Sequence, residues 1–217
     1  LAITHRDVAP SNVIVTYDGV VKLVDFGVAK ASTNLVQTRP GTLKGKYAYS
    51  SPEQIEHYTL DARSDVFSLG VVLHEILTTH RLFKGASPAH VLRAVMEAEI
   101  LPPSKLNHAV PGELDRVTLA ALHRDRDKRI PSAGKLREYL EAVMRKYKWD
   151  VGPADVAAWM RESFPEHYAS RLELERTVLS DGRLPVHGEQ DDSSLPPAFQ
   201  TASGTRTSSA STAASLG

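Results

Sequence analysis

Short apolar runs separated by polar turns mark the first part of the chain. Val13–Val15 and residues 20–24 are rich in β-branched side chains and have the length of strands, and Asp18-Gly19 between them is typical of a tight turn. The pattern predicts an antiparallel β-hairpin. Because a hairpin folds back on itself, we expect the loop before its first strand to lie beside the loop after its second.

Helical periodicity dominates the chain between residues 50 and 180. Ser51-Pro52-Glu53-Gln54 is typical of a helix start, with Ser51 as N-cap and Gln54 completing a capping box. Residues 65–77 are apolar nearly all round, which indicates a helix in the middle of a domain. Further amphipathic helices are predicted from Ser87, over residues 112–122, over residues 132–144, and over residues 153–164, where Val156, Trp159, Met160 and Phe164 share one face.

We expect the helix over residues 153–164 to dock back on the domain rather than to bind a partner. Residues 201–217 are almost wholly Ser, Thr, Ala and Gly. Such a segment buries too little apolar surface to offset the entropy of ordering, so residues 181–217 are expected to form a disordered tail or linker.

Composition excludes several classes of protein. Of the 217 residues, 41% are hydrophobic and 24% charged, which is ordinary for a soluble globular domain, and equal numbers of basic and acidic residues leave no net charge to attract nucleic acid. Cysteine is absent, which is compatible with a cytoplasmic location. No apolar run is long enough to span a membrane. The first residue is Leu1 and no signal segment follows it, so we expect the chain to begin inside a longer protein.

Two polar motifs flank the predicted hairpin. His5-Arg6-Asp7 with Asn12 precedes it, and Asp25-Phe26-Gly27 follows it. The hairpin would bring two carboxylates and a carboxamide into one space. Phosphoryl transfer from a metal-bound nucleotide needs such a set, because one carboxylate receives the hydroxyl proton and the other oxygens hold Mg²⁺.

These motifs resemble the catalytic loop and the metal-binding loop of the eukaryotic-type protein kinases. Asn12 follows Asp7 by five residues, and Asp25 follows it by 18. The sequence of these motifs is most similar to that of bacterial Ser/Thr kinases, particularly those of myxobacteria. The same similarity holds for the later stretch Gly45-Lys46-Tyr47-Ala48-Tyr49-Ser50-Ser51-Pro52-Glu53-Gln54. The resemblance covers residues 1–146, with residues 147–180 as a helical C-terminal extension.

The resemblance implies the fold and the roles of individual residues. The fold is mainly α (α+β), the large C-terminal lobe of a protein kinase with a short β-hairpin at the catalytic cleft. Asp7 would accept a hydrogen bond from the substrate hydroxyl, and Asn12 and Asp25 would bind the Mg²⁺ that accompanies ATP. The resemblance also implies a set of supporting residues: His5 packed on Phe26, Arg6 paired with a phosphate, Gly27 at a sharp turn, Asp65 capping the catalytic loop, and Glu53 paired with Arg129.

The polar stretch from Ala31 to Ser50 is predicted to be a loop, and the resemblance implies that it lies within the activation segment, which runs from Asp25 to Glu53. Thr38 and Thr42, and more weakly Thr33, are candidate phosphorylation sites, although each could equally be an ordinary loop hydroxyl. A phosphate there would add charge near Arg6 and could order the loop.

The sequence departs from the family in three respects. It contains no Gly-rich phosphate loop, no Val-Ala-x-Lys strand and no Glu-bearing helix, so we expect it to be a fragment that is inactive without a small lobe. Ala9 stands where most Ser/Thr kinases carry Lys, and Lys46 stands where they carry Thr. We hypothesise that Lys46 supplies the charge that Ala9 lacks, the alternative being an ordinary solvated charge.

The sequence therefore predicts a serine/threonine protein kinase that uses ATP and Mg²⁺ and acts on protein substrates, with no nucleic acid partner and an unknown oligomeric state. A non-catalytic kinase-like scaffold is the competing interpretation, and the retained Asp7, Asn12 and Asp25 argue against it. A small-molecule phosphotransferase is disfavoured because the activation segment and Ser51-Pro52-Glu53 would form a platform for a protein substrate.

Overall fold

The computed structural model describes residues 4–26 and 47–181. The chain divides into two compact units, residues 1–165 and 166–217. The described part of the second unit belongs to helix α9 (Pro165–Asp181), which carries an Arg171–Glu175 ion pair one turn apart. All other described elements lie in the first unit. Within residues 4–26 and 47–181, no helix is both long and apolar enough to cross a bilayer.

The predicted β-hairpin is confirmed. A 3-10 turn, η1 (Pro10–Asn12), leads into β1 (Val13–Val15), which pairs antiparallel with β2 (Val21–Leu23). Val13 faces Leu23 and Val15 faces Val21 in the register. Gly19 lies in the turn with φ +76°, a conformation that favours glycine, and its amide donates to the Thr16 carbonyl at 2.9 Å.

A second short 3-10 turn, η3 (Tyr47–Tyr49), leads into α2 (Pro52–Ile55). The Gln54 half of the predicted capping box is present, because its side-chain carbonyl accepts from the Ser51 amide at 2.8 Å. The Ser51 hydroxyl makes no cap hydrogen bond, so the other half of the box is not formed.

Helix α3 (Ala62–Thr78) is the predicted central helix. Asp61 caps its start by accepting from the Arg63 amide at 2.8 Å, and Thr79 ends it in the left-handed conformation with φ 58°. Val66, Phe67 and Val71 are fully buried, which confirms its central place. Burial is not complete all round, since the side chain of Ile76 is 69% exposed.

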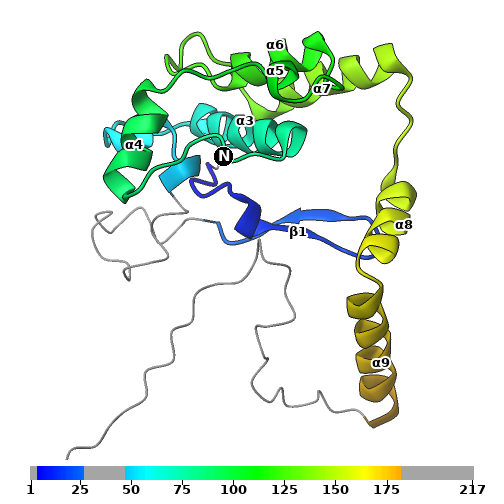
Figure 1. Ribbon diagram of the computed structural model, residues 1–217. Helices are drawn as coiled ribbons and strands as arrows, with labels where there is room; N and C mark the ends of the chain where they lie inside the picture. The colour runs from blue at the N-terminus through cyan, green and yellow to red at the C-terminus, as the bar shows by residue number, and fades with distance from the viewer. Residues whose placement is uncertain (1–3, 27–46, 182–217) are drawn as a thin grey trace, which may run out of the picture. The chain divides into compact units, whose positions relative to one another are not determined.

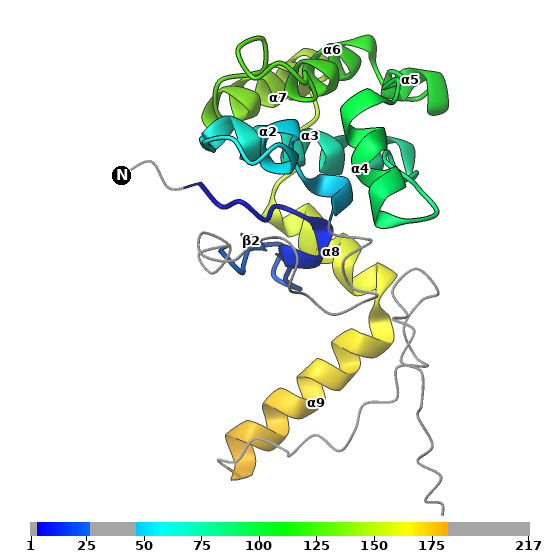
Figure 2. The same ribbon diagram turned by 90° about the vertical axis from the view of Figure 1, so that its left-hand side faces the viewer.

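Several helices follow α3 in the first unit, and three of them contact it. Helices α6 and α7 pack on one side of it, and the loop before the hairpin lies on the other (Figures 1 and 2). Two of these helices begin at serine caps, since Ser87 and Ser132 accept from the amides of His90 and Lys135. The four helices that follow α3 are α4 (Pro88–Glu97), α5 (Pro103–Leu106), α6 (Gly112–Ala121) and α7 (Ala133–Tyr147).

Helix α8 (Pro153–Ser163) is present as predicted, and Val156, Met160 and Phe164 of the predicted face are half-buried, but Trp159 is not part of that face. Trp159, assigned to the buried face, is 57% exposed, whereas Ala157 is 3% exposed. Ala157 lies against the hairpin turn at Gly19. A contact between two backbones needs a small residue on each side, so alanine rather than tryptophan occupies it.

Candidate active site

The loop that carries Asp7 is hydrogen-bonded to helix α3 through Asp65. The carboxylate of Asp65 accepts from the His5 amide at 2.7 Å and from the Arg6 amide at 2.8 Å. Arg6 has φ 66°, a left-handed conformation that costs on the order of 1–3 kcal/mol in a residue other than glycine. The two hydrogen bonds to Asp65 stabilise this turn of the backbone just before Asp7.

The same loop is also hydrogen-bonded to helix α2 through Gln54. The Gln54 side-chain amide donates to the Arg6 carbonyl at 2.9 Å while its oxygen accepts from the Ser51 amide. Gln54 therefore joins the loop that carries Asp7 to the segment that begins α2. Sequence analysis assigned Gln54 only to the capping box, and nothing in the sequence points to this second bond.

His5 links the two motifs that flank the hairpin. Its ring is buried, with Nε2 at 3.1 Å from the Val24 carbonyl oxygen and the ring centroid 4.6 Å from that of Phe26. The contact with Phe26 is the one that the resemblance implied. Together the contacts of His5 with Val24 and Phe26 fix the backbone on both sides of Asp25 against the loop that carries Asp7.

Asn12 forms a second link between the two motifs. Its side-chain nitrogen donates to the Asp7 carbonyl at 2.8 Å, and its backbone carbonyl accepts from the Val24 amide at 2.9 Å. A carboxamide can bind a cation only through its oxygen, and the hydrogen bond from the nitrogen to Asp7 fixes the orientation of that oxygen. The Ser11 hydroxyl also lies 3.4 Å from this oxygen.

Asp25 follows directly and has φ 64°, so it too is in the left-handed region, with its side chain exposed. Asp7 by contrast is 9% exposed. Carboxylate and carboxamide oxygens suit Mg²⁺, which commonly takes one or two protein ligands and completes its shell with water and phosphate oxygens. The donors on Asn12 and Asp25 fit that pattern. Within residues 4–26 and 47–181, no cluster of three His, Cys, Asp or Glu side chains could hold a metal by itself.

Several predicted site residues lie outside the described residues. These are Gly27, Lys46 and the threonines Thr33, Thr38 and Thr42. Ala9 is described, and it is 3% exposed in an apolar cluster with Tyr49 and Phe67. The position where most Ser/Thr kinases carry lysine is thus packed into the core here.

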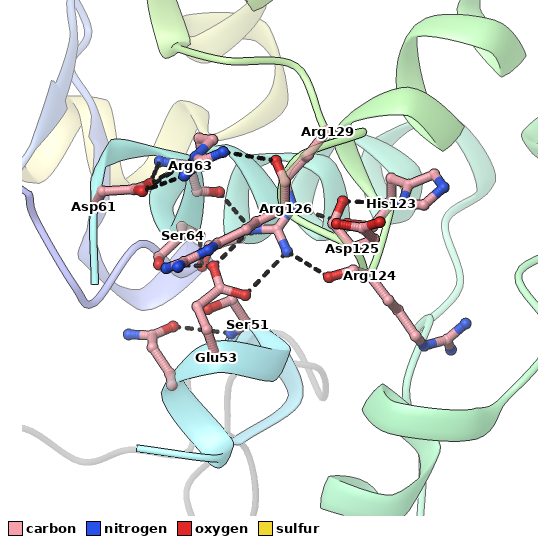
Figure 3. A network of polar contacts seen from close by, with 12 residues as sticks. Ser51, Glu53, Asp61, Arg63, Ser64, His123, Arg124, Asp125, Arg126 and Arg129 are labelled. Atoms are coloured by element: carbon pink, nitrogen blue, oxygen red, sulfur yellow. Dashed lines mark hydrogen bonds and ion pairs between the residues drawn. The ribbon is translucent and has the colours of Figure 1, made fainter. Parts of the chain in front are cut away.

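Glu53 and Arg129 form a buried ion pair, as expected from the resemblance (Figure 3). The two Arg129 terminal nitrogens lie 2.6 and 3.0 Å from the Glu53 oxygens, and Ser64 donates to the same carboxylate at 2.7 Å. Burial alone raises the pKa of Glu53, but the hydrogen bonds from Arg129 and Ser64 outweigh it and hold that pKa below its usual value. The remaining Arg129 donors reach backbone carbonyls of His123, Arg63 and Arg124.

A second arginine ties the start of α3 to the loop after α6. Arg63 pairs with Asp61 at 2.7 Å (Figure 3). It also pairs with Asp127 at 2.7 Å and donates to the Arg126 carbonyl at 3.2 Å. Sequence analysis did not find this contact, because it joins residues more than 60 positions apart and no motif marks it.

Tyr49 and Glu75 form a further polar contact that sequence analysis missed. The Tyr49 hydroxyl donates to Glu75 at 2.7 Å and accepts from Arg81, while Glu75 also accepts from the Leu82 amide at 3.0 Å. Burial and the hydrogen bond to Glu75 raise the pKa of Tyr49 well above its usual range. Glu75 therefore joins α3 to the segment before α2.

Comparison with known proteins gives one family and several relatives. Residues 1–140 match the family model described as protein kinase domain. The chain is 39% identical over 166 residues to the tyrosine-protein kinase MasK of Myxococcus xanthus, covering 76% of this chain and 26% of that protein. It is 42% identical over 143 residues to the serine/threonine-protein kinase PknB of Mycolicibacterium smegmatis, covering 65% and 23%.

A third relative, a probable serine/threonine-protein kinase of Streptomyces coelicolor, is 38% identical over 144 residues, covering 65% of this chain and 21% of that protein. The chain thus spans about a quarter of the length of the curated relatives it matches. The match to the M. xanthus protein covers 76% of the chain and so extends beyond the family model and through the residues of α8.

Proposed function

The chain belongs to the protein kinase domain family, and from this premise we propose that it is the large lobe of a bacterial serine/threonine protein kinase. The reaction is transfer of the γ-phosphate of ATP to a hydroxyl group of a protein substrate. One observation carries the proposal: His5 and Asn12 both bond to Val24, which joins the loop of Asp7 to the segment of Asp25.

Asp7 orients the attacking hydroxyl and accepts its proton. A positioned carboxylate of this kind contributes about 10²- to 10⁴-fold to the rate. Asn12 hydrogen-bonds to the backbone carbonyl of Asp7, which keeps the loop in one conformation while substrate binds. His5, buried against Phe26, keeps the two flanking loops together.

Asn12 and Asp25 are the residues that hold Mg²⁺ in this proposal. When bound, the ion would supply positive charge that neutralises the charge developing during phosphate transfer. The side-chain oxygen of Asn12 is directed by the bond from its nitrogen to Asp7, which supports its role as a ligand.

The protein substrate lies, in this proposal, along η3 and the start of α2. Gln54 connects that segment to the catalytic loop, and the Tyr49–Glu75 bond connects it to α3, so the platform is rigidly attached on two sides. Phosphorylation of Thr38 or Thr42 would pair with Arg6 and order the activation segment. Lys46 would supply positive charge beside Asp7 in place of the missing lysine at Ala9. We place the reaction in the cytoplasm, where ATP is available.

Two other functions compete. The printed name of the M. xanthus relative is a tyrosine kinase, which makes tyrosine a second candidate acceptor. A kinase-like scaffold without activity is the other, and the three retained polar side chains of Asp7, Asn12 and Asp25 argue against it. The chain contains no counterpart of the lysine that grips the α- and β-phosphates, so activity would require a nucleotide-binding lobe.

The test is phosphate transfer from labelled ATP by the full-length parent protein, followed by identification of the modified amino acid. Replacing Asp7→Asn should lower turnover by about 10²-fold or more, because the carboxylate that receives the proton is lost. Asp150→Asn, an exposed aspartate after α7, is the control and should leave turnover unchanged. Phosphotyrosine as the product would favour the tyrosine kinase, and no transfer by the wild-type parent would favour the scaffold.

A further inference from the structure

The hairpin that connects the two catalytic loops is poorly supported by its own strands. Side chains of both strands are exposed, with Val21 at 60%, Ile14 at 47% and Leu23 at 38%. A two-stranded hairpin is at best marginally stable in water without packing against another element. Its conformation therefore depends on what holds its two ends.

The end of the hairpin near Asn12 and Val24 is held by the contacts already described around His5 and Asn12. The turn at Gly19 is held by helix α8, toward which the hairpin extends (Figure 1). A Cβ placed on Gly19 would lie 1.8 Å from the carbonyl oxygen of Pro153 and 3.0 Å from the amide nitrogen of Ala157. The turn backbone thus sits directly on the first turns of α8, and only glycine fits there.

Further contacts extend this interface along α8. The guanidinium of Arg161 donates two hydrogen bonds, each 3.4 Å long, to the Tyr17 carbonyl. Ala157 is 3% exposed, whereas its neighbour Ala158 is exposed. Gly19 is itself buried although it lies in a turn. The hairpin turn is thus covered by one face of α8.

A continuous set of backbone hydrogen bonds runs from this interface to the candidate metal ligands. Gly19 donates to Thr16, Thr16 donates to Val20, and the strand pairs lead to the bond from Val24 to Asn12, each of these three bonds being 2.9 Å long. Asn12 and Asp25 are thus at the far end of the ribbon whose turn α8 holds. Movement at the turn would be transmitted along three residue pairs.

We propose that helix α8 is an intramolecular positioning element for the metal site, which holds the hairpin turn so that Asn12 and Asp25 keep their relative position. The helix lies beyond the residues that match the protein kinase domain model, so this function is an addition to the family's domain. Its consequence for metal binding rests on the proposed kinase function, but its effect on the hairpin does not. Ala157 and Arg161 are positioning residues and touch no substrate.

Amide hydrogen exchange on the 217-residue chain tests the effect on the hairpin directly. Ala157→Lys places a long charged side chain in the buried contact, and Ala158→Lys makes the same change one residue away on the exposed face. We expect the amides of Thr16, Gly19 and Val24 to exchange about tenfold faster or more in Ala157→Lys and unchanged in Ala158→Lys. Amides of helix α3 should be unchanged in both variants.

Unchanged exchange of the hairpin amides in Ala157→Lys would overturn the proposal. If that variant fails to fold by circular dichroism, Arg161→Ala decides the matter, with Glu162→Ala as its control, and equal hairpin exchange in these two variants would also overturn it. These outcomes do not depend on enzymatic activity.

The second measurement is the Mg²⁺ concentration that half-saturates phosphate transfer by the full-length parent protein. Ala157→Lys should raise it about tenfold, as expected for loss of a group that orients metal ligands, and Ala158→Lys should not. A faster-exchanging hairpin with unchanged Mg²⁺ dependence would overturn the link to the metal site. An inactive wild-type parent would contradict the proposed function and leave the exchange result to decide whether α8 holds the hairpin.

Discussion

At the scale of single residues, charged pairs in this protein differ widely in their surroundings. The side chains of Arg129 and Glu53 are 0% and 6% exposed, whereas those of Arg93 and Glu97 are 75% and 62% exposed. The nitrogen–oxygen distance is nevertheless similar, 2.6 Å between Arg129 and Glu53 and 2.7 Å between Arg93 and Glu97. Burial rather than distance should therefore decide how much each pair matters for stability.

Arg129→Leu should lower the free energy of unfolding by about 3–5 kcal/mol, because Glu53 is then left buried and unpaired. Five hydrogen bonds from the Arg129 guanidinium are lost with it. Urea unfolding followed by circular dichroism measures the change.

Arg93→Leu is the matched control and should leave the same free energy nearly unchanged, since an exposed pair one helical turn apart contributes little. Similar losses from the two variants would contradict the assignment of Glu53 and Arg129 as a structural pair.

At the scale of elements, helix α3 sets the conformation of the loop that carries Asp7. It does so through one residue, Asp65, in its first turn. The helix is fully buried at Val66 and Phe67 next to it, so the carboxylate is placed with little room to move.

Asp65→Asn should lower the free energy of opening of the loop at His5 and Arg6 by about 1–3 kcal/mol. The carboxamide keeps one acceptor but turns its nitrogen toward the other backbone amide. We expect faster hydrogen exchange at the amides of His5 and Arg6. Asp115→Asn is the control: that carboxylate likewise accepts from an amide, at Ser104, and its loss should affect exchange only there. Slow exchange at His5 and Arg6 in Asp65→Asn would show that the loop is held by other contacts.

The elements themselves were largely predictable from sequence. The hairpin followed from two β-branched runs around Asp18-Gly19, and the starts of α2 and α4 followed from Ser51-Pro52 and Ser87. Helix α3 begins at Ala62, before the predicted residue 65, and the short helix α5 was not predicted. The centre of the buried face of α8 was not predictable. Hydrophobicity placed Trp159 on that face, whereas a close backbone contact with Gly19 requires the small residue Ala157.

At the scale of the whole molecule, stability should depend on the ionisation of the buried Glu53. Its pKa in the folded protein lies below its ordinary value of 4.5. The charged form is therefore favoured by folding, and its contribution is complete above that ordinary value. The contribution is lost as the pH falls through the depressed folded pKa.

We expect the free energy of unfolding to fall between pH 5 and the folded pKa of Glu53, with the Glu53→Gln variant less stable at pH 7 but with a shallower dependence below pH 5. Urea unfolding at a series of pH values measures both slopes. Equal slopes for Glu53→Gln and the unchanged protein would show that other carboxylates account for acid unfolding.

The sequence by itself determined the family, the local elements and the identity of the candidate catalytic residues, because these depend on short motifs and on periodicity over neighbouring positions. Tertiary structure decided which distant groups meet. Gln54 reaches Arg6, Tyr49 reaches Glu75, and the turn at Gly19 meets the helix that contains Ala157. Such contacts depend on the path of the whole chain, and a polar or small residue carries no local signal of the partner that folding brings to it.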